Sequence, residues 1–283
     1  MFKKIVLGTA NFDQKYGFKK KKFDPLDFKE LFNLNSKINN NIDTAFSYKK
    51  SLNIIKKYSN YRQIIYSKIP CIFKNNIDPN NIEKIFQNHL KSIDVERIYS
   101  LSFHNPKNLK FKRGRKIHKK LQKLKDKKII KKIGISVNDP KELELIKNFD
   151  IDLVQFPLNI FDQRFIEKKN LNLFKKKKIE IQIRSIFLQG TLLEKETPKK
   201  LNKFNNSFND FRAYCKKTKK SQLFHCVNFI KNINCVDSVV VGASNLNEFK
   251  EIIKAFKYKS KKFNYFKFKK KYKDLIMPVK WKK

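Results

Sequence analysis

Four side chains of complementary chemistry follow three short apolar runs of this chain. Ile42-Asp43-Thr44-Ala45-Phe46-Ser47-Tyr48 contains a carboxylate and a phenol, Tyr66-Ser67-Lys68 ends on an ammonium, and Phe103-His104-Asn105-Pro106 contains an imidazole. Such a set suits carbonyl reduction. Hydride delivery to a carbonyl carbon leaves a growing alkoxide, and that oxygen must receive a proton. We therefore expect Tyr48 to act as the proton donor.

The other three groups can make a phenol a usable acid. A tyrosine has a reference pKa of about 10, and a nearby cation lowers it by stabilising the phenolate. Lys68 can supply that cation, and Asp43 can orient Lys68 and balance its charge. His104 can donate a hydrogen bond that positions the substrate oxygen. A lone Asp, Lys or His at a strand end is more often structural, but four complementary groups on three successive strand ends favour catalysis.

These residues need a scaffold that collects the ends of parallel strands at one face. Eight compact apolar runs have the character of strands covered on both faces: Lys4–Thr9, Asn41–Thr44, Gln63–Lys68, Ile98–His104, Lys132–Ser136, Leu153–Phe156, Ile179–Ser185 and Ser238–Gly242. Strand and helix alternating eight times in 283 residues predict a closed (β/α)₈ TIM barrel with a parallel sheet and surrounding helices. Catalytic groups of such a barrel lie at the carboxyl ends of its strands.

The intervening segments predict helices, with one exception. Asp78–Leu90, Pro140–Asn148 and Asn245–Phe256 have apolar residues at helical spacing, and the first two follow an Asp-Pro start. The polar segment Glu194–Asp210 is interpreted as a long loop over the barrel mouth. No linker interrupts the pattern, so residues 1–283 are expected to form a single domain, with a basic and aromatic tail at about 257–283 packing on the barrel.

The net charge of +42 has two readings. An excess of this size attracts polyanions such as nucleic acids. However, only seven of the 67 basic residues are Arg, the lysines are spread along the whole chain, and Lys, Asn, Ile and Phe, which have AT-rich codons, are all abundant. We favour codon bias and expect no specific nucleic-acid partner. A polyanion-binding protein stays open as an alternative, and it would need its basic residues concentrated on one face.

The sequence lacks several motifs that would indicate a membrane span, a metal site or a common nucleotide-binding loop. No apolar run approaches the length of a membrane span, and the first residues run directly into a strand, so a soluble cytoplasmic protein is expected. Four cysteines without CxxC spacing predict free thiols and no metal site. The six glycines form neither GxGxxG nor GxxxxGK[ST]. Any nucleotide must therefore be held by another device.

The chain resembles the aldo-keto reductase family over almost its whole length. Leu7-Gly8-Thr9-Ala10 is similar to the opening strand of the family, and Ile42-Asp43-Thr44-Ala45 with the following tyrosine is similar to its active-site segment, although Lys49 stands where Gly usually follows. Ser67-Lys68 and Phe103-His104-Asn105-Pro106 are similar to its lysine and histidine elements. The resemblance implies a catalytic tetrad, which consists of Asp43, Tyr48, Lys68 and His104.

The same resemblance implies a cofactor site. Ile133-Gly134-Ile135-Ser136 is similar to the strand that holds the nicotinamide carboxamide, with Val137 at the place of an Asn, so Ser136 and Gln155 would carry that task. Arg184 and Ser185 stand where many members place an aromatic ring against the nicotinamide, and a planar guanidinium can stack there. Gly242, Ala243 and Ser244 are similar to the phosphate-binding turn, where backbone N–H groups opening a helix meet an anion.

The family prefers NADP, often through a basic residue in the first turns of the helix that follows this turn. Here Glu248 and Glu251 lie in those turns, with Lys250 as the nearby base. We expect NADP as the cofactor with NAD as the alternative. Because the Glu248 carboxylate would repel a 2′-phosphate, the preference for NADPH is expected to be less than about tenfold.

The sequence therefore predicts an NAD(P)H-dependent oxidoreductase that reduces an aldehyde or ketone, as a monomer or weak oligomer. Leu7-Gly8-Thr9-Ala10 with the later Tyr16-Gly17, and the ending Pro278-Val279-Lys280-Trp281, resemble a bacterial branch often associated with surface-sugar metabolism. A sugar-derived carbonyl is therefore a candidate substrate. A nucleotide-sensing barrel or regulatory subunit is the alternative. The complete set of four groups argues against it, because a sensor needs no proton donor.

Overall fold

The computed structural model describes residues 4–13, 17–18, 23–60 and 62–281. Eight strands form one closed barrel in which each strand runs parallel to the next and β8 pairs with β1. They are β1 (Lys4–Gly8), β2 (Asn41–Asp43), β3 (Ile64–Ile69), β4 (Ile98–Phe103), β5 (Ile130–Ser136), β6 (Leu153–Pro157), β7 (Glu180–Arg184) and β8 (Ser238–Val241). The predicted (β/α)₈ barrel is confirmed. Tyr16, which contributed to the family resemblance, lies outside the described residues.

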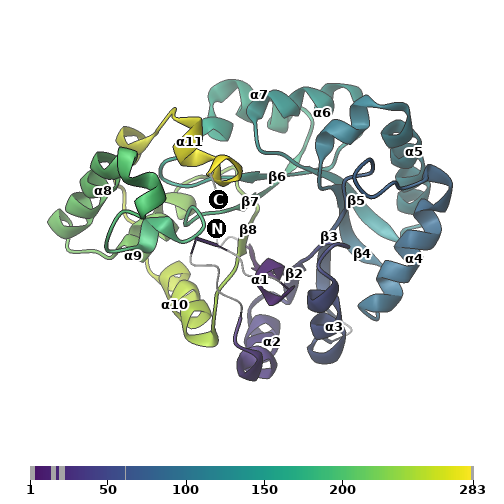
Figure 1. Cartoon of the computed structure of the whole chain (residues 1–283), viewed down its shortest axis with the longest axis horizontal. Coiled ribbons are helices and arrows are strands. Elements are labelled where there is room, and N and C mark those ends of the chain that lie inside the picture. Colours follow the sequence, from purple (N-terminus) through teal and green to yellow (C-terminus); the bar gives the residue numbers. More distant parts are fainter. Residues whose placement is uncertain (1–3, 14–16, 19–22, 61, 282–283) are drawn as a thin grey trace.

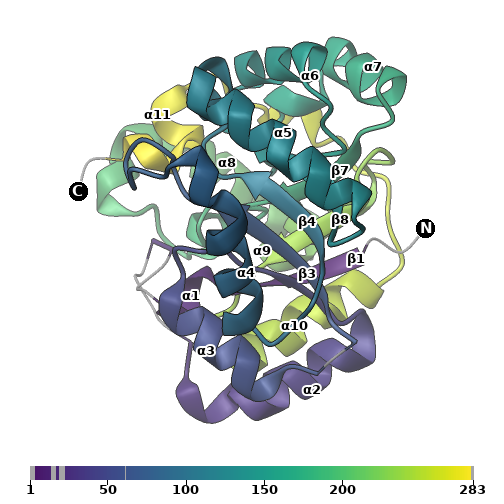
Figure 2. The ribbon, with the colours of Figure 1, turned by 90° about the vertical axis from the view of Figure 1, so that its right-hand side faces the viewer.

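Helices surround the barrel on its outer side (Figure 1). The α-helices of the described residues are α1 (Ala10–Asp13), α2 (Phe28–Ile38), α3 (Lys49–Tyr58), α4 (Ile82–Ser92), α5 (Lys112–Asp126), α6 (Leu145–Asn148), α7 (Lys168–Lys176), α8 (Asn205–Lys217), α9 (Gln222–Lys231), α10 (Leu246–Lys257) and α11 (Lys273–Ile276). The short α1 and α11 lie over the middle of the barrel in the view of Figure 1 and are not part of the outer layer. Seen from the side, α2 and α10 lie together below the strands (Figure 2), and the two helices are in contact.

The helix α10 shows how local sequence produces this layer. The Asn245 side chain accepts a hydrogen bond from the N–H of Glu248 and so caps the helix start. Apolar residues at helical spacing, among them Phe249, Ile252 and Phe256, are buried against the barrel. The helix predicted from Asn245 to Phe256 is therefore confirmed.

Two other predictions need correction in their helical type. After Asp78, the residues Pro79–Asn81 form a 3₁₀ turn, η2, before α4 begins. After Asp139, the residues Pro140–Glu144 form a 3₁₀ helix, η4, and only Leu145–Asn148 are α-helical. A 3₁₀ helix rises about 2.0 Å per residue against 1.5 Å for an α-helix, so it spans more of a short crossover with the same residues.

The predicted loop over Glu194–Asp210 is wrong in its second half. A 3₁₀ helix, η7, covers Lys199–Phe204, and α8 begins at Asn205. The buried residues of α8 are Phe208, Phe211 and Cys215, which lie at helical spacing. The many Asn and Lys residues of the segment obscured this apolar stripe, which is the physical reason for the helix.

The tail after α10 is anchored by buried side chains. Tyr265, Phe268, Leu275 and Ile276 belong to the main apolar core. The Tyr265 hydroxyl lies 3.0 Å from Nδ1 of His225 in α9 and accepts a hydrogen bond from Asn228. These contacts agree with a tail that packs on the barrel, and the single-domain organisation of 1–283 stays a prediction.

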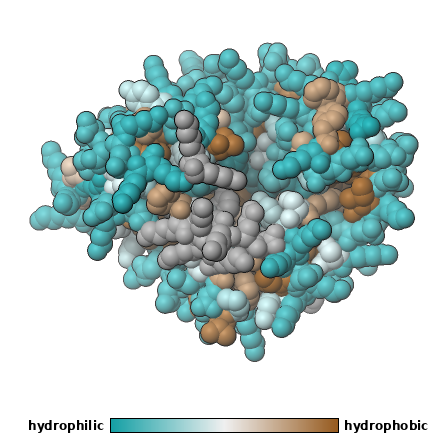
Figure 3. Space-filling model, viewed as in Figure 1, coloured by the Kyte–Doolittle hydropathy of each residue, from teal (hydrophilic) through white to brown (hydrophobic). Residues whose placement is uncertain are grey.

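The surface is mostly hydrophilic on the face drawn in Figure 3, with apolar side chains scattered over it. Among the described residues, no helix is long and apolar enough to cross a membrane. Within the same residues, no three His, Cys, Asp or Glu side chains are grouped so that they could hold a metal ion.

Candidate active site

A buried ion pair joins β2 and β3 at their carboxyl ends. Lys68 Nζ lies 2.6 Å from both carboxylate oxygens of Asp43 and donates to the carbonyl of Thr44 at 3.2 Å. The side chains of Lys68 and Asp43 are only 5% and 9% exposed. The register places Asp43 beside Tyr66, two residues before Lys68, so the barrel itself brings the two groups together. The structure thus unites two of the four residues predicted for catalysis.

A belt of polar side chains continues from this pair across the barrel interior. Gln155 Nε2 donates to Asp43 Oδ2 at 2.8 Å and to Gln182 Oε1 at 2.6 Å. Ser136 Oγ donates to Gln155 Oε1 at 3.4 Å, and Gln182 Nε2 donates to Ser238 Oγ at 3.2 Å. Gln155, which the sequence analysis assigned to the cofactor, therefore also holds Asp43 in place.

Sequence reasoning missed Gln182 and Ser238, although a signal was present. Gln182 stands between Ile181 and Ile183 in β7, and an amide inside an apolar strand of a parallel barrel needs a buried partner. Its partners lie on β6 and β8, the two neighbouring strands. The position of a polar residue within such a strand thus points to an interior network.

Tyr48 and His104 lie side by side. Their ring centroids are 6.4 Å apart and the rings are nearly perpendicular. Tyr48 is the residue just before α3, and His104 follows β4, where its backbone N–H donates to the carbonyl of Ile69 on β3. Both side chains are partly buried. The structure therefore places this pair of predicted residues together, one after β2 and the other after β4, on either side of β3.

Burial and charge determine the protonation of the site. Burial, together with the positive charges of Lys68 and Arg184, lowers the pKa of His104 to about 4. His104 is consequently neutral at pH 7 and has one N–H to donate. Burial also lowers the pKa of Lys68, while the Asp43 carboxylate opposes that shift by favouring the ammonium.

A histidine that the sequence did not point to, His89, contacts the residue next to Lys68 in β3. His89 of α4 lies with Nε2 2.8 Å from the hydroxyl of Ser67 and stacks on Phe46 with 3.9 Å between ring centroids. Burial lowers the pKa of His89 to about 3. His89 is thus a neutral packing residue that contacts both β3, through Ser67, and the segment after β2, through Phe46.

Arg184 lies at the end of β7, next to a cavity. Its guanidinium donates to Asn138 Oδ1 at 2.8 Å and to the carbonyl of Val137 at 3.3 Å. The cavity, of about 200 Å³, is bounded by Pro157, Arg184 and Ser185 and by the C-terminal residues Ile276–Val279. Ser185 adopts a left-handed backbone with φ of 60°, which is rare outside glycine. A planar group could enter here against the guanidinium.

The predicted phosphate-binding turn differs from the expectation in one respect. Gly242, Ala243 and Ser244 do lead from β8 into α10. However, the N–H of Ser244 donates to the Glu248 carboxylate, and the N–H of Leu246 donates to the Asp27 carboxylate, both at 2.8 Å. These backbone donors therefore already have anionic partners from the chain itself.

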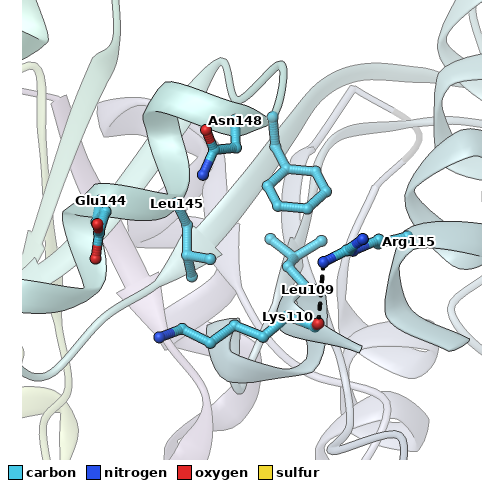
Figure 4. A pocket seen from close by; sticks show the side chains of 7 residues that line it. Leu109, Lys110, Arg115, Glu144, Leu145 and Asn148 are labelled. Atoms are coloured by element: carbon cyan, nitrogen blue, oxygen red, sulfur yellow. Dashed lines mark hydrogen bonds between the residues drawn. The ribbon is translucent and has the colours of Figure 1, made fainter. Parts of the chain in front are cut away.

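A larger hollow elsewhere contacts none of the four predicted catalytic residues. It measures about 600 Å³ and lies between Leu109 and Lys110 on one side and Glu144, Leu145 and Asn148 on the other (Figure 4). Its edge is held by Arg115, which donates to the carbonyl of Lys110 at 3.3 Å. The residues predicted for catalysis therefore do not line this larger hollow.

The sequence profile of the Aldo/keto reductase family matches residues 4–271. This chain belongs to the aldo/keto reductase family. Membership makes it an oxidoreductase, and members generally use nicotinamide cofactors and act on small carbonyl substrates. A search of curated proteins finds no match to this aldo/keto reductase.

Solved structures of bacterial aldo-keto reductases share the fold. The glycerol dehydrogenase of Gluconobacter oxydans superposes with a TM-score of 0.68 at 20% identity, over 93% of this chain and 89% of its own. An aldo-keto reductase from Bacillus halodurans, in its holo form, superposes with a TM-score of 0.73 at 16% identity, over 94% and 90%. At these identities the likeness of this aldo/keto reductase to both proteins concerns the barrel architecture alone.

Proposed function

We propose that this protein reduces an aldehyde or ketone to an alcohol, with NADH or NADPH as hydride donor and Tyr48 as proton donor. The observation that carries the proposal is the grouping at the barrel mouth. Tyr48, which follows β2, and His104, which follows β4, lie side by side, and the buried Lys68–Asp43 pair lies on β2 and β3. A phenol, a neutral imidazole and a balanced ammonium are the groups that protonation of a nascent alkoxide requires.

The chain's own residues have distinct tasks in this reaction. The Tyr48 hydroxyl donates its proton to the carbonyl oxygen, which leaves a phenolate. The Lys68 ammonium stabilises that phenolate, and Asp43 keeps Lys68 charged and oriented through two contacts of 2.6 Å. His104, neutral because its pKa is about 4, donates an N–H hydrogen bond that orients the carbonyl. A bound reduced nicotinamide would supply the hydride.

Two ends of the proposed cofactor site differ in how well they fit. At the nicotinamide end, Arg184 and Ser185 border the cavity of about 200 Å³. Ser136 and Gln155 lie on neighbouring strands, and their oxygens remain as acceptors, because their own N–H and O–H groups donate within the polar belt. We propose these residues for the nicotinamide. At the other end, Gly242, Ala243 and Ser244 would face the adenosine phosphates, but the Glu248 carboxylate already accepts the Ser244 N–H. That end does not fit the additional 2′-phosphate that NADPH has and NADH lacks.

Oxidation of NADH and NADPH, followed at 340 nm with an activated aldehyde such as 4-nitrobenzaldehyde, tests the proposal. Tyr48→Phe should lower kcat by a factor of about 10² to 10⁴, the usual contribution of general acid catalysis, and leave the cofactor Kd nearly unchanged. Tyr258→Phe, at an exposed tyrosine after α10, is the matched control and should keep full activity.

Undiminished turnover in Tyr48→Phe would remove Tyr48 from the mechanism. A wild-type protein that binds the nucleotide but oxidises it with no aldehyde or ketone would contradict the reductase function as a whole and favour the nucleotide-sensing alternative.

A further inference from the structure

The first turn of α10 is closed by side chains of the chain itself. Backbone N–H groups at a helix start lack partners within the helix and attract anions. In α10, the N–H groups of Ser244 and Leu246 donate to the carboxylates of Glu248 and Asp27, each at 2.8 Å. The N–H of Glu248 donates to the Asn245 side chain, also at 2.8 Å. Two negatively charged groups therefore stand where an incoming phosphate would seek its donors.

Asp27 reaches this position through the packing of a distant segment. It ends the 3₁₀ turn η1 (Pro25–Asp27) just before α2, and α2 packs beside α10 (Figures 1 and 2). The turn is fastened to the same loop by the N–H of Asp24, which donates to the carbonyl of Ser244 at 3.2 Å. Asp27 is thus held against the start of α10 by backbone as well as by its own carboxylate.

The basic residue near the start of this helix, Lys250, also has a partner. Lys250, which the sequence analysis considered as a partner for a 2′-phosphate, lies 3.8 Å from the Glu30 carboxylate of α2. This ion pair is exposed and weak, but its Glu30 carboxylate offsets the positive charge of Lys250 beside the same helix.

The acidic character of this region stands against the composition of the chain. The sequence has 67 basic and only 25 acidic residues. Five of those 25 lie in the segment from Asp24 to α2 or in the first two turns of α10: Asp24, Asp27, Glu30, Glu248 and Glu251. A region this acidic in so basic a protein is poorly suited to an additional phosphate.

We propose that Asp27 and Glu248 together make this enzyme discriminate against the 2′-phosphate, so that it binds NADH in preference to NADPH. The inference rests on the proposed function, and it moves the balance beyond the sequence-based expectation of a small NADPH preference, because that expectation included Glu248 but not Asp27. NADH and NADPH share the pyrophosphate and differ only in the 2′-phosphate. The ratio of their dissociation constants therefore reports the 2′-phosphate alone, and the change of this ratio in a variant that lacks one carboxylate reports that carboxylate.

Direct binding measurements test the inference without turnover. Isothermal titration of the full-length protein with NADH and with NADPH should give a lower Kd for NADH. Asp27→Asn and Glu248→Gln keep an oxygen that can accept the backbone N–H but remove the charge. Each should shift the Kd ratio toward NADPH by about fivefold at low salt, and by less at 0.5 M salt, because screening weakens exposed charges. The double variant should shift it by about 25-fold if the two sites add.

Glu251→Gln is the matched control, since Glu251 is exposed on the same helix one turn further from its start. It removes the same charge and should change the ratio less than twofold. Thermal unfolding of each variant, expected to stay close to wild type, excludes a loss of fold as the cause of any shift.

The outcomes separate the two levels of the argument. A wild-type preference for NADPH, or unchanged ratios in both Asp27→Asn and Glu248→Gln, would overturn the inference while leaving the reductase function intact. Failure of both nucleotides to bind the folded wild-type protein would refute the proposed function itself.

Discussion

Replacing Lys68 separates its structural role from its proposed chemical role. In the wild-type structure, both carboxylate oxygens of Asp43 lie 2.6 Å from Lys68 Nζ. In Lys68→Met, the Asp43 carboxylate would stay in the barrel interior without this cation. Removal of one partner from a buried ion pair destabilises a protein by about 3–5 kcal/mol. The amide of Gln155 keeps one hydrogen bond to Asp43 but brings no charge. We therefore expect a loss near the lower end of that range.

A variant that removes both charges provides the comparison. Lys68→Met combined with Asp43→Asn leaves a neutral amide beside Gln155, so most of the lost stability should return. Turnover should not return, because no cation remains to stabilise a Tyr48 phenolate. Unfolding free energies from urea titrations and the rate of NADH or NADPH oxidation measure the two properties independently. A domain of this size has about 5–15 kcal/mol of stability, so the single variant should still fold.

Two results would refute this reasoning. A Lys68→Met protein as stable as wild type would mean that Asp43 is not held as a buried carboxylate. A double variant with normal turnover would mean that Lys68 serves only to neutralise Asp43 and takes no part in proton transfer.

Two further predictions concern stability. Burial lowers the pKa of His225 to about 4 against about 6.5 in the unfolded chain, so unfolding takes up a proton between these values. Stability should therefore be greatest above pH 6.5 and fall as the pH drops toward 4, by at most about 1.4 kcal/mol per pH unit from this residue. Urea titrations at pH 7 and pH 5 measure the fall in unfolding free energy, which should be smaller in His225→Gln than in wild type. An equal fall in both proteins would contradict the assignment to His225. Gly114→Ala should lower Tm by roughly 2–6 °C, because a Cβ at Gly114 would lie 1.9 Å from the carbonyl oxygen of Asn108. This clash should outweigh the usual preference of alanine for a helix. A Tm equal to or above that of wild type in calorimetry would show that the backbone moves to accept the methyl group.

The positions of the four proposed catalytic residues in the barrel could be predicted from the sequence, while their roles stay a prediction. Asp43 and Lys68 lie near the carboxyl ends of β2 and β3, and Tyr48 and His104 come after β2 and β4. Parallel strands that close in chain order must present their carboxyl ends at one face. Alternation of apolar runs with capped amphipathic segments depends on neighbouring residues, so it can be read along the chain. Asn245, as the cap of α10, is an example of such local information.

The sequence failed where a local pattern was masked or had more than one outcome. In α8, the apolar residues at helical spacing stand among many polar ones, so the helix was not predicted. The Asp-Pro pairs that begin at Asp78 and Asp139 predicted helices but did not distinguish α-helical from 3₁₀ geometry. These choices depend on how much distance a crossover must span, which only the packed barrel determines.

The contact that most changes the view of the cofactor lies wholly in the tertiary structure. Asp27 and Leu246 are 219 positions apart, and nothing in either segment announces the other. The sequence by itself determined the barrel, the order of its strands and the residues at their ends, because burial periodicity and caps act over a few residues. The closing of the barrel decided that α2 lies beside α10 and that a carboxylate meets the helix start, because contacts between the first and last units exist only once β1 pairs with β8.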